Sequence, residues 1–180
     1  SDLKGVGDLK YNDKDYVLVM QHPVTNSKLS TEFQIEQTLS AIKKLNMNTI
    51  WFWPNADSGA DKISKRLRIF RENEINSKIY FIKNLPPKKF IPLINNSKCL
   101  IGNSSLGIRE CSFLGIPVVN IGERQINRER GNNVVNSDYN SKEIFKKIKL
   151  QIRRDRFPSE LIFGKGNSGK KIAEKLIQII

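Results

Sequence analysis

The chain has 180 residues, of which 38% are hydrophobic and 8% aromatic, and its formal net charge is +13. This length suits one domain with its own core, or half of a two-domain protein, and we expect one compact domain. No apolar run reaches the roughly 20 residues that a membrane-spanning helix needs. The opening SDLKGVGDLK contains no hydrophobic signal segment. Composition therefore argues against a membrane protein and gives no indication of secretion.

The positive charge admits three interpretations: nucleic-acid binding, attraction of a phosphorylated substrate, or a solvated surface. In KEIFKKIK, Ile144, Phe145 and Ile148 recur at helical spacing, which favours the solvated face of an amphipathic helix. Nucleic acid is therefore the less favoured partner. Cys99 and Cys111 lie in apolar segments without CxxC spacing, which is typical of reduced core thiols in the cytoplasm.

Short apolar runs alternate with longer segments that carry apolar residues at helical spacing. This alternation predicts an α/β fold, a Rossmann-like parallel sheet with helices on both faces. Ligands of such sheets bind beyond the carboxyl ends of the strands. We expect strands at 15–20, 49–53, 78–82, 99–102, 117–121 and 133–135, and helices at 31–45, 59–72, 87–95, 106–114, 141–152 and 168–180.

The loop after the fourth expected strand reads Asn103-Ser104-Ser105 and leads directly into a helix. Main-chain N–H groups and hydroxyls at a helix N-terminus favour an anion such as phosphate. Serine is also a common helix cap, and the two interpretations are compatible. Glu110, more than one turn into the same expected helix, either accepts hydrogen bonds from a sugar diol or is an ordinary exposed glutamate.

Three other strand ends carry candidate polar residues. His22 is the only histidine, which excludes a metal site built from several histidines. It follows the first expected strand, where an imidazole can bind phosphate or transfer a proton, although a lone histidine is more often structural. Asn55 follows the second strand, and turn formation explains it adequately. Arg124 follows the fifth, where it can pair with phosphate or remain a surface charge.

Two common signatures, the GxxxxGK[ST] loop and the GxSxG elbow, are missing from the sequence. The string GKGNSG at 164–169 fits the spacing GxGxxG, but it lies near the end of the chain and follows no expected strand. The dinucleotide-binding, P-loop and hydrolase-elbow interpretations therefore lack their usual support.

Five segments, taken in order and with their separations, resemble the carboxyl-terminal half of the hydrolysing UDP-N-acetylglucosamine 2-epimerases of the sialic-acid pathway: QHPVT, PNADSG, GNSSLGIRE, FLGIPVVNIGERQ and GNNVV. The resemblance runs from about residue 15 to the terminal GKGN and its following helix. It implies a glycosyltransferase-B-type fold, with a UDP-sugar between two Rossmann-like domains. Residues 1–180 would form the second, UDP-binding domain, with residues 1–14 as a remnant of the interdomain connection.

The same resemblance implies roles for individual residues. Ser104 and Ser105, with the adjoining Asn103, should bind the diphosphate, and Glu110 should accept from the ribose hydroxyls. The main chain around Phe90 should contact uracil. His22 matches a site histidine implicated in catalysis, and Asn55 and Arg124 match positions that line the same cleft.

The implied reaction needs no cofactor. UDP is eliminated across C1 and C2 of the sugar, and water then adds to release free N-acetylmannosamine. Members of the family carry their catalytic carboxylates mainly on the first domain, which is absent from this chain. We therefore expect the chain to bind UDP or a UDP-sugar but to be inactive alone. Its expected partners are the missing amino-terminal domain and, in the parent enzyme, further copies of itself.

Two alternatives remain open. One is the donor-binding domain of a UDP-sugar glycosyltransferase of the same fold. The other is a basic RNA-binding domain, which would need exposed aromatic rings, whereas Trp51, Phe52 and Phe81 fall in expected core strands.

Two positions depart from the family pattern. Asn127 stands where glycine is common, and asparagine tolerates positive φ better than most residues, so the turn there can be kept. Lys165, in GKGN, stands where an acidic residue is usual.

Overall fold

The computed structural model describes residues 15–74 and 78–179. Six strands form one parallel sheet in the order β3-β2-β1-β4-β5-β6, which is the strand order of Rossmann folds. The predicted α/β Rossmann-like sheet is confirmed, while the predicted connection at 1–14 lies outside the described residues. The strands are β1 (Tyr16–Met20), β2 (Asn48–Phe52), β3 (Ile79–Ile82), β4 (Leu100–Gly102), β5 (Val118–Ile121) and β6 (Val134–Ser137).

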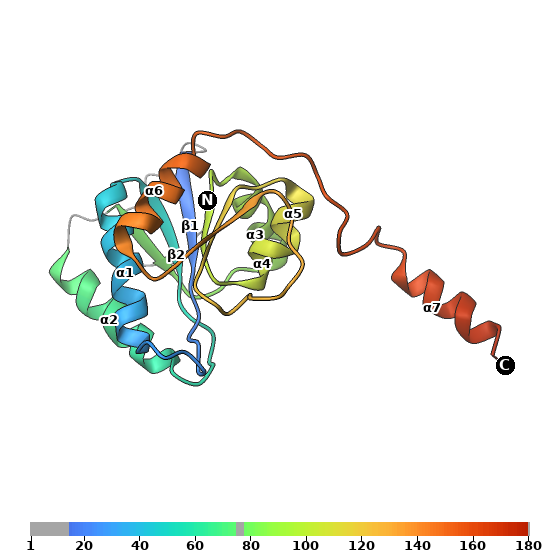
Figure 1. The fold of residues 1–180 in the computed structure, drawn as a ribbon, viewed down its shortest axis with the longest axis horizontal. Coiled ribbons are helices and arrows are strands. Elements are labelled where there is room, and N and C mark those ends of the chain that lie inside the picture. The colour runs from blue at the N-terminus through green and yellow to red at the C-terminus, as the bar shows by residue number, and fades with distance from the viewer. Residues whose placement is uncertain (1–14, 75–77, 180) are drawn as a thin grey trace.

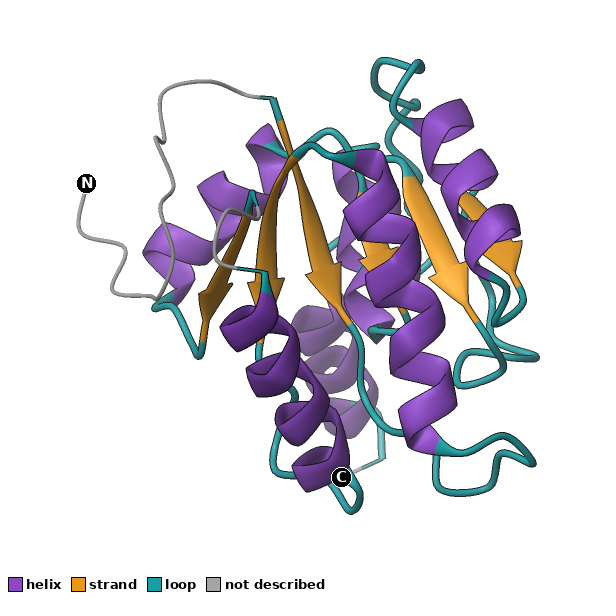
Figure 2. Cartoon of the chain, turned by 90° about the vertical axis from the view of Figure 1, so that its left-hand side faces the viewer, coloured by secondary structure: helices purple, strands orange, loops and turns teal. Residues whose placement is uncertain are grey.

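Helices cover both faces of the sheet (Figures 1 and 2). Apolar residues of α1, α2 and α6 pack on one face, and those of α3 and α5 pack on the other. Because side chains alternate along a strand, Val17 and Val19 join the first core while Leu18 joins the second. The helices are α1 (Thr31–Leu45), α2 (Ala60–Asn73), α3 (Pro87–Asn96), α4 (Ser105–Ile108), α5 (Glu110–Leu114), α6 (Ser141–Gln151) and α7 (Ser168–Ile177).

The aromatic residues of the central strands are buried, as predicted. Trp51 is fully buried, Phe81 is 1% exposed and Phe52 is 5% exposed. None of these three rings can stack on a nucleic-acid base, but Phe33, Phe113 and Phe163 are exposed elsewhere on the chain. The apolar face of the predicted amphipathic helix is also confirmed, because Ile144 and Ile148 of α6 are fully buried.

Local capping signals explain why the bounds of α1 match the sequence prediction. The hydroxyl of Ser30 accepts a hydrogen bond from the Phe33 N–H at 3.2 Å, which satisfies one of the free donors of the first turn. At the other end, Asn46 adopts a left-handed conformation with φ of 50° and terminates the helix.

The prediction of one continuous helix at 106–114 is wrong. The chain forms two short helices, α4 and α5, which are separated by Arg109 with φ of −103° and ψ of −80°. Apolar spacing could not reveal the break, because Ile108 and Cys111 are both buried on either side of it. As a consequence, Glu110 is the first residue of α5 and not a residue deep inside a longer helix.

Smaller differences affect two other elements. The last strand runs from Val134 to Ser137, whereas the sequence predicts 133–135. The side chain of Asn133 instead donates to the Ile116 carbonyl at 2.8 Å, just before the strand begins. The final helix ends at Ile177 and not at the end of the chain.

The carboxyl-terminal helix differs from the others. No residue of α7 is buried, and the helix stands away from the sheet at the end of an extended segment (Figure 1). Across residues 15–74 and 78–179, every helix is too short or too polar to cross a membrane.

Candidate functional site

The carboxyl ends of β1 and β4 form the centre of the candidate site. These strands are adjacent, and the strand order runs outward from them in both directions, so their ends mark the crevice where open α/β sheets bind ligands. Gly102 ends β4 with φ of 130°. A Cβ atom on Gly102 would lie 2.1 Å from the Met20 carbonyl oxygen, so only glycine allows this close approach.

Asn103 joins the two strand ends through its side chain. Its Oδ1 accepts from the His22 main-chain N–H at 2.7 Å, and its Nδ2 donates to the His22 carbonyl at 2.8 Å. Its own main-chain N–H donates to the Met20 carbonyl at 3.1 Å. Asn103 is fully buried. The predicted site residues His22 and Asn103 are therefore in direct contact.

The loop after β5 meets the same point. Gln125 Nε2 donates to the Asn103 carbonyl at 2.8 Å, and Arg124 Nη1 donates to that carbonyl at 3.3 Å. The other guanidinium nitrogen, Nη2, lies 3.9 Å from the Asp57 carboxylate in the loop after β2. We call His22, Asn103, Arg124 and Gln125 the switch-point cluster.

The environment of His22 favours a neutral imidazole. The residue is 5% exposed, and its Nδ1 is buried without a hydrogen-bond partner. Burial lowers the pKa of His22, the positive charge of Arg124 lowers it further, and the Asp57 carboxylate opposes both effects. Near neutral pH the ring is therefore uncharged and can accept or donate one hydrogen bond.

Ser104 and Ser105 lie beside the cluster, at the start of α4, and both are half-buried. The Ser104 hydroxyl accepts from the Leu106 N–H at 3.4 Å, so the capping interpretation of this serine holds. The anion interpretation stays a prediction. Because α4 has only four residues, any attraction for phosphate has to come from local N–H groups and hydroxyls more than from a helix dipole.

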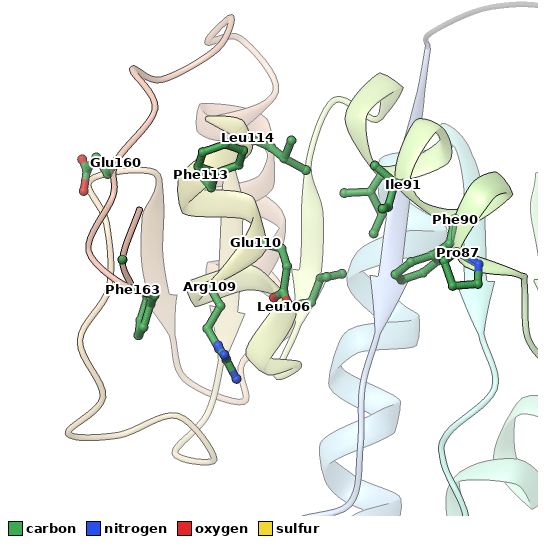
Figure 3. A pocket seen from close by; sticks show the side chains of 12 residues that line it. Pro87, Phe90, Ile91, Leu106, Arg109, Glu110, Phe113, Leu114, Glu160 and Phe163 are labelled. Atoms are coloured by element: carbon green, nitrogen blue, oxygen red, sulfur yellow. The ribbon is translucent and has the colours of Figure 1, made fainter. Parts of the chain in front are cut away.

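A cavity of about 510 Å³ opens beside α4. Pro87, Phe90 and Ile91 of α3 line one side, with Leu106 and Glu110 facing them (Figure 3). We call this the apolar cavity; its remaining lining residues are Ile94, Arg109, Phe113, Leu114, Glu160, Phe163 and Gly164.

Phe90 and Glu110 are therefore brought together, as the sequence prediction requires. The ring of Phe90 packs edge-on against Phe52, with 5.4 Å between the centroids. The Glu110 side chain is exposed at the beginning of α5. A carboxylate at the mouth of an apolar cavity can orient a ligand whose flat part lies inside.

The far wall of the cavity comes from residues after the last core helix, which sequence reasoning did not assign to the site. The Glu160 N–H donates to the Ser112 carbonyl at 3.1 Å, and the Glu160 carboxylate accepts from the Asn132 side chain at 2.8 Å. The Phe163 ring lies 5.8 Å from the Arg109 guanidinium. The sequence signal was the apolar run LIF at 161–163, which the helical and strand patterns left unexplained.

The remaining predicted residue, Asn55, is exposed in the loop after β2, two positions before Asp57. Asp57 approaches the switch-point cluster, since its carboxylate lies 3.9 Å from Arg124. Gln125 is the residue that sequence reasoning missed at this point, although it directly follows Arg124 in GERQ. Within residues 15–74 and 78–179, His, Cys, Asp and Glu side chains form no group of three that could hold a metal ion.

Comparison with known proteins assigns the family. The family described as UDP-N-acetylglucosamine 2-epimerase matches residues 3–177. The chain belongs to this family. The UDP-N-acetylglucosamine 2-epimerase of Neisseria meningitidis serogroup B is 28% identical over 167 residues, which cover 93% of this chain and 43% of that protein. The GDP/UDP-N,N'-diacetylbacillosamine 2-epimerase (hydrolyzing) of Campylobacter jejuni is 33% identical over 141 residues, covering 77% and 36%.

A solved 2-epimerase has the same fold. The UDP-GlcNAc 2-epimerase of Methanocaldococcus jannaschii, in complex with UDP-GlcNAc and UDP, superposes with a TM-score of 0.68 at 18% identity. The match covers 92% of this chain and 46% of that one. The chain thus spans less than half the length of the 2-epimerases that it matches. Membership of the UDP-N-acetylglucosamine 2-epimerase family, predicted from the five sequence segments, is confirmed, while the hydrolysing type stays a prediction.

Proposed function

We propose that the chain is the UDP-binding domain, residues 1–180, of a hydrolysing UDP-N-acetylglucosamine 2-epimerase. The observation that carries this proposal is the arrangement at the carboxyl edge of the sheet. Ser104 and Ser105 lie between the switch-point cluster, which is polar, and the apolar cavity, which contains Phe90 and Glu110. A nucleoside diphosphate has chemical groups in a matching order: an anionic diphosphate for the polar side, a ribose diol, and a flat base for the apolar cavity.

Each part of UDP has a proposed contact. Ser104 and Ser105 bind the diphosphate with their hydroxyls and N–H groups, and Arg124 adds a positive charge at the same edge. Glu110 accepts hydrogen bonds from the ribose diol. Uracil enters the apolar cavity and meets the main chain around Phe90.

His22 is the residue of this chain that we assign to catalysis. Elimination of UDP breaks the bond between C1 and the diphosphate oxygen, so negative charge develops on the leaving diphosphate. A neutral imidazole beside that oxygen can donate a hydrogen bond to it, which stabilises the developing charge. We also assign Asn55, which is exposed in the loop after β2, to this cleft.

The rest of the reaction belongs to the part of the longer protein that this chain lacks. Removal of the C2 proton needs a base, and we propose that the amino-terminal domain supplies it. The chain alone is then inactive. Two relatives of this chain are named as hydrolyzing enzymes that act on diacetylbacillosamine nucleotides, which supports the hydrolysing type. The buried free thiols of Cys99 and Cys111 suit a reducing compartment such as the cytoplasm.

Calorimetric titration of the chain with UDP, UMP and uridine tests the binding part of the proposal. We expect affinity to fall in that order, because the diphosphate contributes charge-assisted hydrogen bonds. Ser104→Ala should weaken UDP at least about tenfold and uridine little, since a hydrogen bond to a charged group contributes about 1.5–3 kcal/mol. The matched control is Ser168→Ala, on the exposed α7.

An assay with the missing domain restored tests the reaction type. A chimera of this chain with the amino-terminal half of the Neisseria relative should release free N-acetylmannosamine from UDP-N-acetylglucosamine. Formation of UDP-N-acetylmannosamine would contradict the hydrolysing type. Transfer of the sugar to an acceptor, with no epimerised product, would instead support the glycosyltransferase alternative. No UDP binding by either the chain or the chimera would overturn the proposal altogether.

A further inference from the structure

The orientation of His22 depends on groups outside its own ring. Its Nδ1 is buried without a hydrogen-bond partner, so that nitrogen does not fix the direction of the imidazole. Its main chain is held on both sides instead, because the Asn103 amide accepts from the His22 N–H and donates to the His22 carbonyl. A side-chain amide suits this arrangement because it carries an acceptor and a donor on two separate atoms.

Gln125 holds the main chain of Asn103 in place. It is 1% exposed, and its Nε2 donates to the Asn103 carbonyl, which also accepts from Arg124. The carbonyl is thus held by two donors from the loop after β5, and that loop turns back at Asn127 with φ of 60°. Asn127 stands where the family commonly has glycine, and its positive φ keeps the turn that follows Gln125.

We propose that Asn103 and Gln125 are positioning residues, which set the directions of His22 and Arg124 and do not themselves bind the nucleotide. This proposal replaces the sequence prediction that Asn103 binds UDP. The side chain of Asn103 is fully buried and already bonded at both of its polar atoms. The functional consequence rests on the proposed nucleotide site, but the geometric claim about His22 can be tested without it.

The chain contains one histidine, so a single imidazole signal in an NMR titration reports on His22 without assignment. The variants are Asn103→Ala and Gln125→Met, the second of which removes the donor while keeping the length of the side chain. Asn84→Ala is the control, because Asn84 is exposed in the loop after β3. Circular dichroism establishes that each variant is folded before it is compared.

Loss of the positioning contacts should let the imidazole reach solvent. The pKa of His22, which burial and Arg124 now hold below its ordinary value, should move up toward that value in both variants and stay unchanged in the control. The affinity for UDP relative to uridine should fall about tenfold or more, because a misplaced Arg124 no longer makes its charge-assisted hydrogen bond to the diphosphate. General destabilisation would weaken both ligands alike.

The outcomes separate the positioning claim from the proposed function. If folded Asn103→Ala and Gln125→Met keep the wild-type pKa of His22, the positioning claim is wrong, whether or not UDP binds. If Asn103→Ala weakens UDP while Gln125→Met leaves both the pKa and the affinity unchanged, Asn103 is a direct ligand and the claim is again wrong. If the pKa rises in both variants but neither the wild-type chain nor the chimera binds UDP, the positioning claim stands and the proposed function fails.

Discussion

The switch-point cluster and the apolar cavity are neighbours, but they are built in different ways. In the cluster, buried polar groups are bonded to one another, as with the Asn103 amide on the His22 main chain and Gln125 on the Asn103 carbonyl. In the cavity, apolar side chains such as Ile91 and Phe113, each 56% exposed, face open space.

The fold alone sets the geometry of the switch-point cluster, whereas the apolar surface of the cavity is covered only when a ligand binds. Hydrogen bonds among buried groups have directions, so the cluster holds its geometry without a ligand. Exposed apolar surface gains free energy only when something covers it. Changes in the cluster should therefore disturb stability and geometry first, whereas changes in the cavity should reduce affinity in a chain that remains folded.

The largest effect is expected from Gly102→Ala. The added Cβ would lie 2.1 Å from the Met20 carbonyl oxygen, at a φ of 130° that alanine rarely adopts. The free energy of unfolding should fall by about 3 kcal/mol or more, as measured by urea denaturation. Gly169→Ala is the control, because nothing lies within 4 Å of that position and alanine favours the helix. Equal stability of the two variants would mean that the fold does not need the close approach of Gly102 to the Met20 carbonyl.

Phe90→Ala should have the next largest effect, and it would show how far the cavity wall contributes to the fold. The half-buried ring packs against Phe52 on the second core. We expect a loss of about 2 kcal/mol in unfolding free energy, less than for a fully buried phenylalanine. UDP affinity should fall as well, as measured by calorimetry. Unchanged affinity in a folded Phe90→Ala variant would show that the ring does not contact uracil and would leave only the proposed main-chain contact.

Glu110→Ala should leave stability within about 0.5 kcal/mol, since this carboxylate is exposed. It should weaken UDP about tenfold, the expected loss for a charge-assisted hydrogen bond. Titration with 2′-deoxy-UDP tests the contact with the ribose diol, because the Glu110→Ala variant should bind 2′-deoxy-UDP and UDP with the same affinity. Glu72→Ala, on an exposed position of α2, should behave like the wild type. A variant that still prefers the ribose form would exclude Glu110 as the diol acceptor.

The smallest effect is a dependence of stability on pH through His22. Its folded-state pKa is below the ordinary value, so between about pH 5 and 7 the unfolded chain binds more protons than the folded one. Stability should therefore rise with pH across this window and fall on acidification. His22→Gln should flatten that slope, as measured by urea denaturation at several pH values. The same slope in both proteins would show that other groups cause it.

Most of the fold could be predicted from the sequence because its signals are local. Runs such as YVLVM, and a serine cap before α1, determine buried strands and helix starts without reference to distant residues. The break at Arg109 could not be predicted, because apolar residues continue at helical spacing through it. Whether the chain kinks there depends on packing against the sheet, where Gly107 lies close to Val118.

The candidate site could be predicted in part for a related reason. Loop residues at strand ends are necessarily near one another in a parallel sheet, so His22, Asn103 and Arg124 were found. The role of Gln125 depends on which atom its side chain reaches, and no sequence pattern specifies that. The wall formed by Glu160 and Phe163 comes from a segment without regular structure, which periodicity does not detect.

NMR mapping of UDP on the isotope-labelled chain tests whether the switch-point cluster and the apolar cavity form one nucleotide site. If they do, UDP should shift the signals of the switch-point residue His22, of Ser104 and Ser105 beside it, and of Phe90 and Glu110 in the cavity, all with one dissociation constant. Uridine should shift only the last two. Shifts confined to the basic helix α6, or different dissociation constants for the two regions, would contradict the claim that both form one nucleotide site.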